Sequence, residues 1–164
     1  MQMDGIRALA YFEGVMREAI HAFKYNQRVE LAPLFGKMLK DYLVIHAVPA
    51  DTVVPVPLHP ERERARGYNQ SLLLANELGA RMSVPVLAHS LRRVRATQPQ
   101  FELNAPERRA NVREAFLADA SVAGARVLLV DDVCTTGATM DECSIALRNQ
   151  GAQSVWGLAL ARGR

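Results

Sequence analysis

Apolar residues recur along this chain in two spacings, one typical of amphipathic helices and one typical of buried strands. In residues 6–45 they recur every three or four positions, as Met16, Ile20 and Phe23 illustrate, so this region is predicted to be mostly helical. The helical spacing returns over residues 68–82 and 138–150. Short apolar runs rich in β-branched residues predict strands over residues 52–56, 84–87, 126–132 and 154–160.

Strands that alternate with helices predict an α/β fold, in which a mostly parallel twisted sheet is flanked by helices. We expect residues 1–164 to form one domain, with a helical N-terminal region at 6–45 and an α/β core at 46–164. Residues 91–113 are polar, rich in arginine and weakly periodic, so they are predicted to form a long loop. Loops of that length inside compact domains are commonly functional or mobile.

The most informative run joins the strand predicted at 126–132 to the helix predicted at 138–150. Four apolar residues, 127–130, lead into the carboxylates of Asp131 and Asp132 at the strand end, where we expect both to be solvated. Successive strand side chains point in opposite directions, so one carboxylate should face a ligand more directly. Two neighbouring carboxylates at this place can accept hydrogen bonds from a diol.

The turn after the two carboxylates can hold a phosphate group. Glycine at this turn lets the backbone approach closely, and the N–H groups at the start of the next helix favour an anion. The candidate phosphate ligands are Thr135, Thr136, Gly137, Ala138 and Thr139. The alternative interpretation, a simple helix-capping loop after an acidic strand end, accounts for each part separately but poorly for the whole run.

Composition and charge narrow the class of protein. The chain is 49% hydrophobic and 23% charged, which is ordinary for a globular protein, and no apolar run approaches the roughly 20 residues of a membrane span. Cys134 and Cys143 are the only cysteines and suggest no disulfide framework, and no secretory signal is visible, so we expect a cytoplasmic location. Residues 61–113 hold ten arginines against five glutamates, a balance of +5 within a net charge of +3. Arginine clusters suit recognition of phosphate or nucleic acid, although a solvated charged face is the plainer alternative.

The run from 127 to 139 resembles the phosphoribosyl pyrophosphate (PRPP) binding motif of type I phosphoribosyltransferases. The resemblance implies that Asp131 and Asp132 hold the ribose 2- and 3-hydroxyls and that residues 135–139 bind the 5-phosphate. A second segment, residues 53–70, resembles the pyrophosphate loop of that family, because a strand ends in closely spaced prolines before an arginine-bearing turn. By resemblance, its pyrophosphate-binding residues would be Pro57, Leu58, His59, Arg62 and Arg66.

Further motifs narrow the resemblance to the ComF/GntX branch, the competence protein F type. They are Pro55-Val-Pro-Leu-His-Pro60, Arg66-Gly-Tyr-Asn-Gln70, Arg93-x-Arg-x-Thr97, Glu107-Arg-Arg-Ala-Asn-Val112 and the N-terminal Phe23-Lys24-Tyr25. Many members of this branch carry an N-terminal four-cysteine zinc module, which is absent from the present sequence. By the same resemblance, residues 6–45 would form the variable hood that selects the acceptor.

The resemblance implies phosphoribosyl transfer from PRPP to a nitrogen acceptor, with release of pyrophosphate. Mg²⁺ would be the cofactor, held mainly by substrate phosphates and waters, with no metal cage in the protein. The long loop would close over bound PRPP, with its contacts supplied by Arg93, Arg95, Gln100, Arg108 and Arg109. The ligand would be PRPP or a nucleoside 5-monophosphate.

Two alternatives to an enzyme stay open. The fold can serve as a PRPP or nucleotide sensor without turnover, because a fold does not fix a function. It can also serve as an accessory in DNA uptake, which the competence-family resemblance implies, with single-stranded DNA or competence-machinery proteins as partners. Whether the chain forms a homodimer is likewise open, and no acceptor can be deduced from the sequence.

Overall fold

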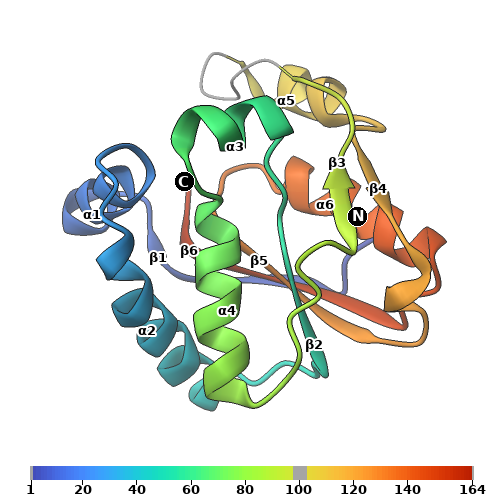
Figure 1. The fold of residues 1–164 in the computed structure, drawn as a ribbon, viewed down its shortest axis with the longest axis horizontal. Helices are drawn as coiled ribbons and strands as arrows, with labels where there is room; N and C mark the ends of the chain where they lie inside the picture. The colour runs from blue at the N-terminus through green and yellow to red at the C-terminus, as the bar shows by residue number, and fades with distance from the viewer. Residues whose placement is uncertain (1, 98–102, 164) are drawn as a thin grey trace.

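A four-stranded parallel sheet forms the centre of the computed structural model, which describes residues 2–97 and 103–163. The strand order is β1-β6-β5-β2, and each neighbouring pair is parallel (Figure 1). The bounds of these strands are β1 Gly5–Tyr11, β2 Thr52–Pro55, β5 Arg126–Cys134 and β6 Ser154–Arg162. The predicted α/β class with a mostly parallel sheet is therefore confirmed.

Helices cover both faces of this sheet. Three helices pack on one face: α1 Gly14–Tyr25, α2 Ala32–Ile45 and α4 Gln70–Met82. On the other face lie α6, Ala138–Asn149, and a small antiparallel pair, β3 Leu91–Arg93 and β4 Phe116–Ala118. The remaining elements are α3 Pro60–Arg66, α5 Ala105–Val112 and the short 3₁₀ turns η1 Val29–Leu31 and η3 Ala120–Val122.

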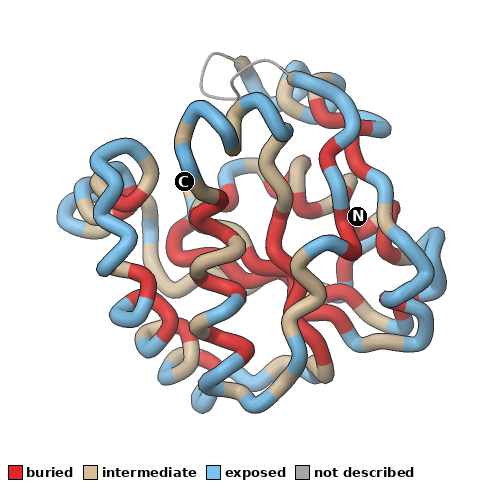
Figure 2. Tube along the Cα trace, in the orientation of Figure 1, coloured by how far each residue is buried: buried red, intermediate tan, exposed pale blue. Residues whose placement is uncertain are grey.

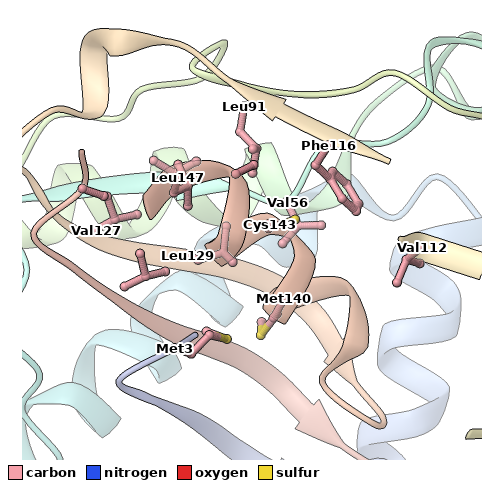
Figure 3. Close-up of a cluster of buried hydrophobic side chains, with 14 of the residues drawn as sticks. Met3, Val56, Leu91, Val112, Phe116, Val127, Leu129, Met140, Cys143 and Leu147 are labelled. Atoms are coloured by element: carbon pink, nitrogen blue, oxygen red, sulfur yellow. The ribbon is translucent and has the colours of Figure 1, made fainter. Parts of the chain in front are cut away.

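The apolar run of β5 explains the two buried layers. Val127 and Leu129 face α6 and the β3–β4 pair, whereas Leu128 and Val130 face α1, α2 and α4, and all four side chains are fully buried. Figure 2 shows this burial along the central strands, and Figure 3 shows Leu129 beneath α6. Full burial of one such side chain stabilises a fold by about 1.5–3 kcal/mol. The buried part of β5 therefore holds Asp131 and Asp132, which follow it, in a fixed position.

The N-terminal region begins with a strand, so the expectation of helices from residue 6 onward is wrong at its start. Residues 5–11 form β1, which pairs with β6 from Gly5 opposite Trp156 to Tyr11 opposite Arg162. The guanidinium of Arg7 lies 5.0 Å from the ring centroid of Trp156. The backbone partner of β1 is about 150 residues away in the sequence, so local periodicity could not reveal it.

The strand predicted at 84–87 is also absent as a strand. Only one isolated parallel bridge forms there, between Val53 and Val86. Pro85 has no N–H group to donate to a sheet, although its carbonyl accepts from the backbone N–H of Val53 and the hydroxyl of Thr52. The segment therefore lies along β2 without extending the sheet.

The predicted loop at 91–113 contains regular structure at both ends. Leu91–Arg93 is β3, and Ala105–Val112 is α5, which begins with a reciprocal capping box between Asn104 and Glu107. Because this box satisfies two N–H groups at the helix start, it stabilises α5 in a segment of weak periodicity. Gln100, which was assigned to this loop, lies outside the described residues.

Candidate functional site

The two carboxylates at the end of β5 have different environments. Asp131 is half-buried, whereas Asp132 is only 2% exposed, so the expectation that both are solvated is wrong for Asp132. Asp132 has the same parity along β5 as Leu128 and Val130, and it meets α1 on that face. Asp131 is consequently the carboxylate that the structure offers to a ligand.

Asp131 is held in place by neighbours from two elements. Its Oδ1 accepts a hydrogen bond from the Ser71 hydroxyl at the start of α4, at 2.9 Å, and another from the backbone N–H of Asp132, at 2.8 Å. Burial, followed by the nearby charge of Asp132, raises the pKa of Asp131 to about 7, and the positive charge of Lys24 opposes that rise. This carboxyl therefore changes charge near neutral pH.

Asp132 forms a buried ion pair with Lys24. The Lys24 Nζ lies 3.2 Å from Asp132 Oδ2, and the backbone N–H of Val133 donates to Asp132 Oδ1 at 2.7 Å. Burial opposes the charge on Lys24, but Asp132 and Asp131 outweigh it, so the pKa of this ammonium lies above its ordinary value. Sequence reasoning assigned Lys24 no role, although it is one of three lysines and lies in the Phe-Lys-Tyr motif.

The loop after β5 has the geometry expected of an anion site. Gly137 precedes the first residue of α6 with φ +79°, a left-handed conformation that favours glycine. Thr136 accepts from the backbone N–H of Ala138 through its hydroxyl oxygen at 3.3 Å. Thr135 is exposed and Thr139 half-buried at the two sides of the turn. The loop thus leads directly into the positive end of a twelve-residue helix.

A cavity of about 150 Å³ adjoins this loop. Its lining residues are Arg109, Thr136, Gly137, Ala138, Asp141 and Glu142. Arg109 comes from α5, so the structure brings a predicted loop arginine to the predicted phosphate site. The two acidic residues bond backbone groups: Asp141 accepts from the N–H of Gln2 and Glu142 from that of Glu114.

The candidate pyrophosphate residues follow β2 and continue onto α3. Pro57, Leu58 and His59 are half-buried, and the His59 ring accepts from the backbone N–H of Glu61 at 3.3 Å. Arg62 donates to the carbonyl of Thr97 at 3.1 Å. Arg66 donates to Gln70, and its guanidinium lies 5.4 Å from the Tyr25 ring centroid. His59 therefore caps a helix, and the two arginines bridge α3 to other segments.

Arg93 and Arg95 do not lie in an open loop. Arg93 is 8% exposed, donates to the Thr97 hydroxyl, and lies 5.3 Å from the Phe116 ring centroid. Burial, and then the charge of Arg62, lowers the pKa of Arg93, which also feels the charge of Asp131. Arg95 donates to the carbonyls of Asn111 and Arg113 at the end of α5, and Arg108 lies on α5 itself. Arg62 and Arg93 thus form a basic pair that meets at Thr97.

The described part of the chain has no cage of protein ligands for a metal ion. Among residues 2–97 and 103–163, no group of three or more His, Cys, Asp or Glu side chains could hold a metal. A magnesium ion that accompanied a substrate would be bound mainly by the substrate phosphates and by waters. In the same part of the chain, no helix is long and apolar enough to cross a bilayer.

Comparison with known proteins agrees with this geometry. The chain is 42% identical to competence protein F of Haemophilus influenzae over 152 residues, which cover 87% of this chain and 66% of that protein. It is 35% identical to the DNA utilization protein YhgH of Escherichia coli K12 over 150 residues, covering 87% of this chain and 65% of that protein. The chain therefore spans just under two thirds of the length of these relatives.

A solved structure with a similar fold is the glutamine PRPP amidotransferase from B. subtilis complexed with ADP and GMP. The TM-score is 0.58 at 24% identity, and the match covers 85% of this chain and 30% of that one. Residues 69–163 match the family described as phosphoribosyl transferase domain, which takes in α4, the Asp131–Asp132 pair and the loop before α6. The chain belongs to the phosphoribosyl transferase domain family, has the type I fold, and is a homologue of competence protein F.

Proposed function

We propose that this protein binds PRPP and transfers its phosphoribosyl group to a nitrogen acceptor. The observation that carries the proposal is the single turn between β5 and α6, which puts the half-buried carboxylate of Asp131 beside a glycine-containing helix start. A ribose 5-phosphate needs both features at once, an acceptor for its hydroxyls and a set of N–H donors for its phosphate.

The phosphate end of the ligand would lie in the cavity beside Gly137 and Ala138. Gly137 and Ala138 line that cavity, and the positive end of α6 favours an anion there. Arg109, from α5, lines the same cavity and can donate to a phosphate through its guanidinium. The ribose would then extend toward Asp131, whose ionised form is the stronger acceptor for a hydroxyl.

The transfer itself exchanges one bond at C1 of the ribose for another. The bond from C1 to the pyrophosphate oxygen breaks, and the leaving group keeps the electron pair. The lone pair of the acceptor nitrogen then forms the new bond to C1, and that nitrogen loses its proton to solvent or to the departing pyrophosphate. Catalysis would depend mainly on position and electrostatics.

Two sources of positive charge would meet the departing pyrophosphate. Arg62 and Arg93 are adjacent through Thr97, and burial, followed by the charge of Arg62, lowers the pKa of Arg93. Mg²⁺ would supply further neutralisation when it is bound with the substrate. A dianion or trianion placed between the two arginines would relieve their mutual repulsion.

Calorimetry with PRPP and Mg²⁺ tests binding, and pyrophosphate release against a panel of bases and amines tests transfer. We expect micromolar or tighter binding that Asp131→Asn weakens, with Asp41→Asn as a control for loss of an exposed carboxylate. Absence of PRPP binding by the folded wild type would refute the proposal. Binding without release of pyrophosphate against any acceptor would favour a sensor.

A role in DNA handling is the second candidate, because the relatives are named for competence and for DNA utilization. The excess of arginine in residues 61–113 is suited to the backbone of single-stranded DNA. Salt-sensitive binding to an oligonucleotide that survives Asp131→Asn would favour this function. Loss of both ligands in that variant would place DNA and PRPP in the same site.

A further inference from the structure

The last turn of α1 meets the candidate site through three consecutive residues. The carbonyl of Phe23 accepts from the Tyr68 hydroxyl, Lys24 pairs with Asp132, and Tyr25 lies under the guanidinium of Arg66. The end of one helix is therefore fixed to β5, to α3 and to the segment before α4. Of these contacts, only the one through Lys24 reaches the acidic pair.

The Lys24–Asp132 pair differs from the other ion pairs among the described residues. Its carboxylate side chain is 3% exposed and its ammonium side chain 22% exposed. In the other pairs every side chain is at least 30% exposed. Exposed pairs contribute little to structure, whereas removing one partner of a buried pair leaves an uncompensated charge. Removal of Lys24 would therefore leave the buried carboxylate of Asp132 without its ion-pair partner.

We propose that Lys24 is a positioning residue of the ribose subsite: it keeps Asp132 as a buried carboxylate against α1, so that Asp131 is free to serve the ligand. This inference rests on the proposed function. Lys24 acts through Asp132 rather than on the ligand. It makes the N-terminal helix part of the ribose subsite, although that helix lies outside the matched family region of residues 69–163.

The charges around Asp131 explain why one ammonium has this effect. Two adjacent carboxylates repel, so the charge of Asp132 makes Asp131 harder to ionise, and the charge of Lys24 opposes this effect. The other groups that face the pair are Ser71 from α4, Arg93 from β3, and the thiols Cys134 of β5 and Cys143 of α6. Burial, and then Asp131, raises the pKa of both thiols, so neither supplies charge at neutral pH.

The inference predicts a proton shift when the ammonium is removed. In Lys24→Met the acidic pair should take up a proton at neutral pH, and the apparent pKa of Asp131 should rise by at least one unit. Lys24→Arg restores the charge and should titrate close to the wild type. Lys37→Met removes an ammonium from an exposed pair with Asp41 and serves as the matched control.

Carbon-detected NMR of the Asp131 carboxyl between pH 5 and 9, without ligand, measures the shift directly. Calorimetry with PRPP and Mg²⁺ over the same range gives the functional readout. PRPP affinity should rise as Asp131 ionises. In Lys24→Met we expect that rise to occur at a higher pH than in the wild type, by the same amount as the Asp131 titration shifts. The dissociation constant at pH 7 should increase by at least about threefold. A 2′,3′-dideoxynucleoside 5′-monophosphate lacks the diol, so its affinity should not change.

An Asp131 titration in folded Lys24→Met that superimposes on the wild type would overturn the inference. If that variant does not fold, Lys24→Gln, which can donate a hydrogen bond but carries no charge, is subject to the same criterion. Failure of the wild type to bind PRPP would refute the proposed function alone, because the ligand-free titration still decides whether Lys24 controls the acidic pair.

Discussion

Replacing Asp131 by Asn should weaken ligand binding and at the same time stabilise the protein above neutral pH. In the folded protein the pKa of Asp131 is about 7, against about 3.9 in an unfolded chain. Between these two values the folded state binds more protons than the unfolded state, so ionisation of Asp131 makes the fold less stable as the pH rises. The loss begins near pH 4 and is complete above pH 7.

The magnitude follows from the size of that shift. A shift of about three units corresponds to roughly 4 kcal/mol, and solvent at this half-buried carboxyl reduces the usable part to about 1–2 kcal/mol. Asn keeps the shape and can still accept from Ser71, but it carries no charge. For a chain of this length, 1–2 kcal/mol raises Tm by about 2–8 °C.

Thermal unfolding of wild type and Asp131→Asn at half-unit steps from pH 4 to 9 tests the stability half. The two Tm curves should meet near pH 4 and separate up to pH 8, with the variant above. Calorimetry at pH 8 tests the other half, where PRPP affinity should fall at least about tenfold, or 1.4 kcal/mol. Parallel Tm curves would refute the electrostatic reasoning, and unchanged affinity would refute the ribose assignment.

Three further results are expected. Gly137→Ala should abolish phosphate binding and lower the unfolding free energy by about 1–2 kcal/mol. Gly124→Ala, also left-handed at φ +73°, should lower it by the same amount without affecting binding. Equal binding in both variants would mean that the phosphate binds elsewhere. Arg109→Ala should weaken PRPP binding by about 1.5–3 kcal/mol in calorimetry, as for a lost charged hydrogen bond, whereas the exposed Arg113→Ala should not. Amide exchange of residues 103–112 should slow on addition of PRPP and Mg²⁺, and identical exchange in both states would mean that α5 is a rigid wall.

The fold class and the strand-turn-helix order around residues 127–139 could be predicted because their determinants are local. The apolar run 127–130, the two carboxylates and the glycine turn follow one another within thirteen residues, and the structure keeps them in that order. The capping box at Asn104 was also present in the sequence. It was missed because residues 91–113 contain few apolar residues, and this outweighed the helix-start signal of Asn104 and Glu107.

The parts that could not be predicted depend on contacts between distant residues. Strand β1 is defined by its bonds to β6, and the burial of Asp132 depends on where α1 ends. Alternation along β5 predicted that the two carboxylates differ, but no local pattern shows which face a lysine more than 100 residues away will reach. The different burial and different partners of Asp131 and Asp132 therefore had to come from the structure.

The pairing of β1 with β6 affects the order in which this protein can assemble during synthesis. Its partner strand, Ser154–Arg162, also completes the other side of β5, so β6 is the strand that joins the first-made and later-made parts of the sheet. While a ribosome still holds β6, β1 has no sheet partner and β5 presents an open edge. Nascent chains stalled before residue 154 should consequently expose that edge to chaperones and to one another.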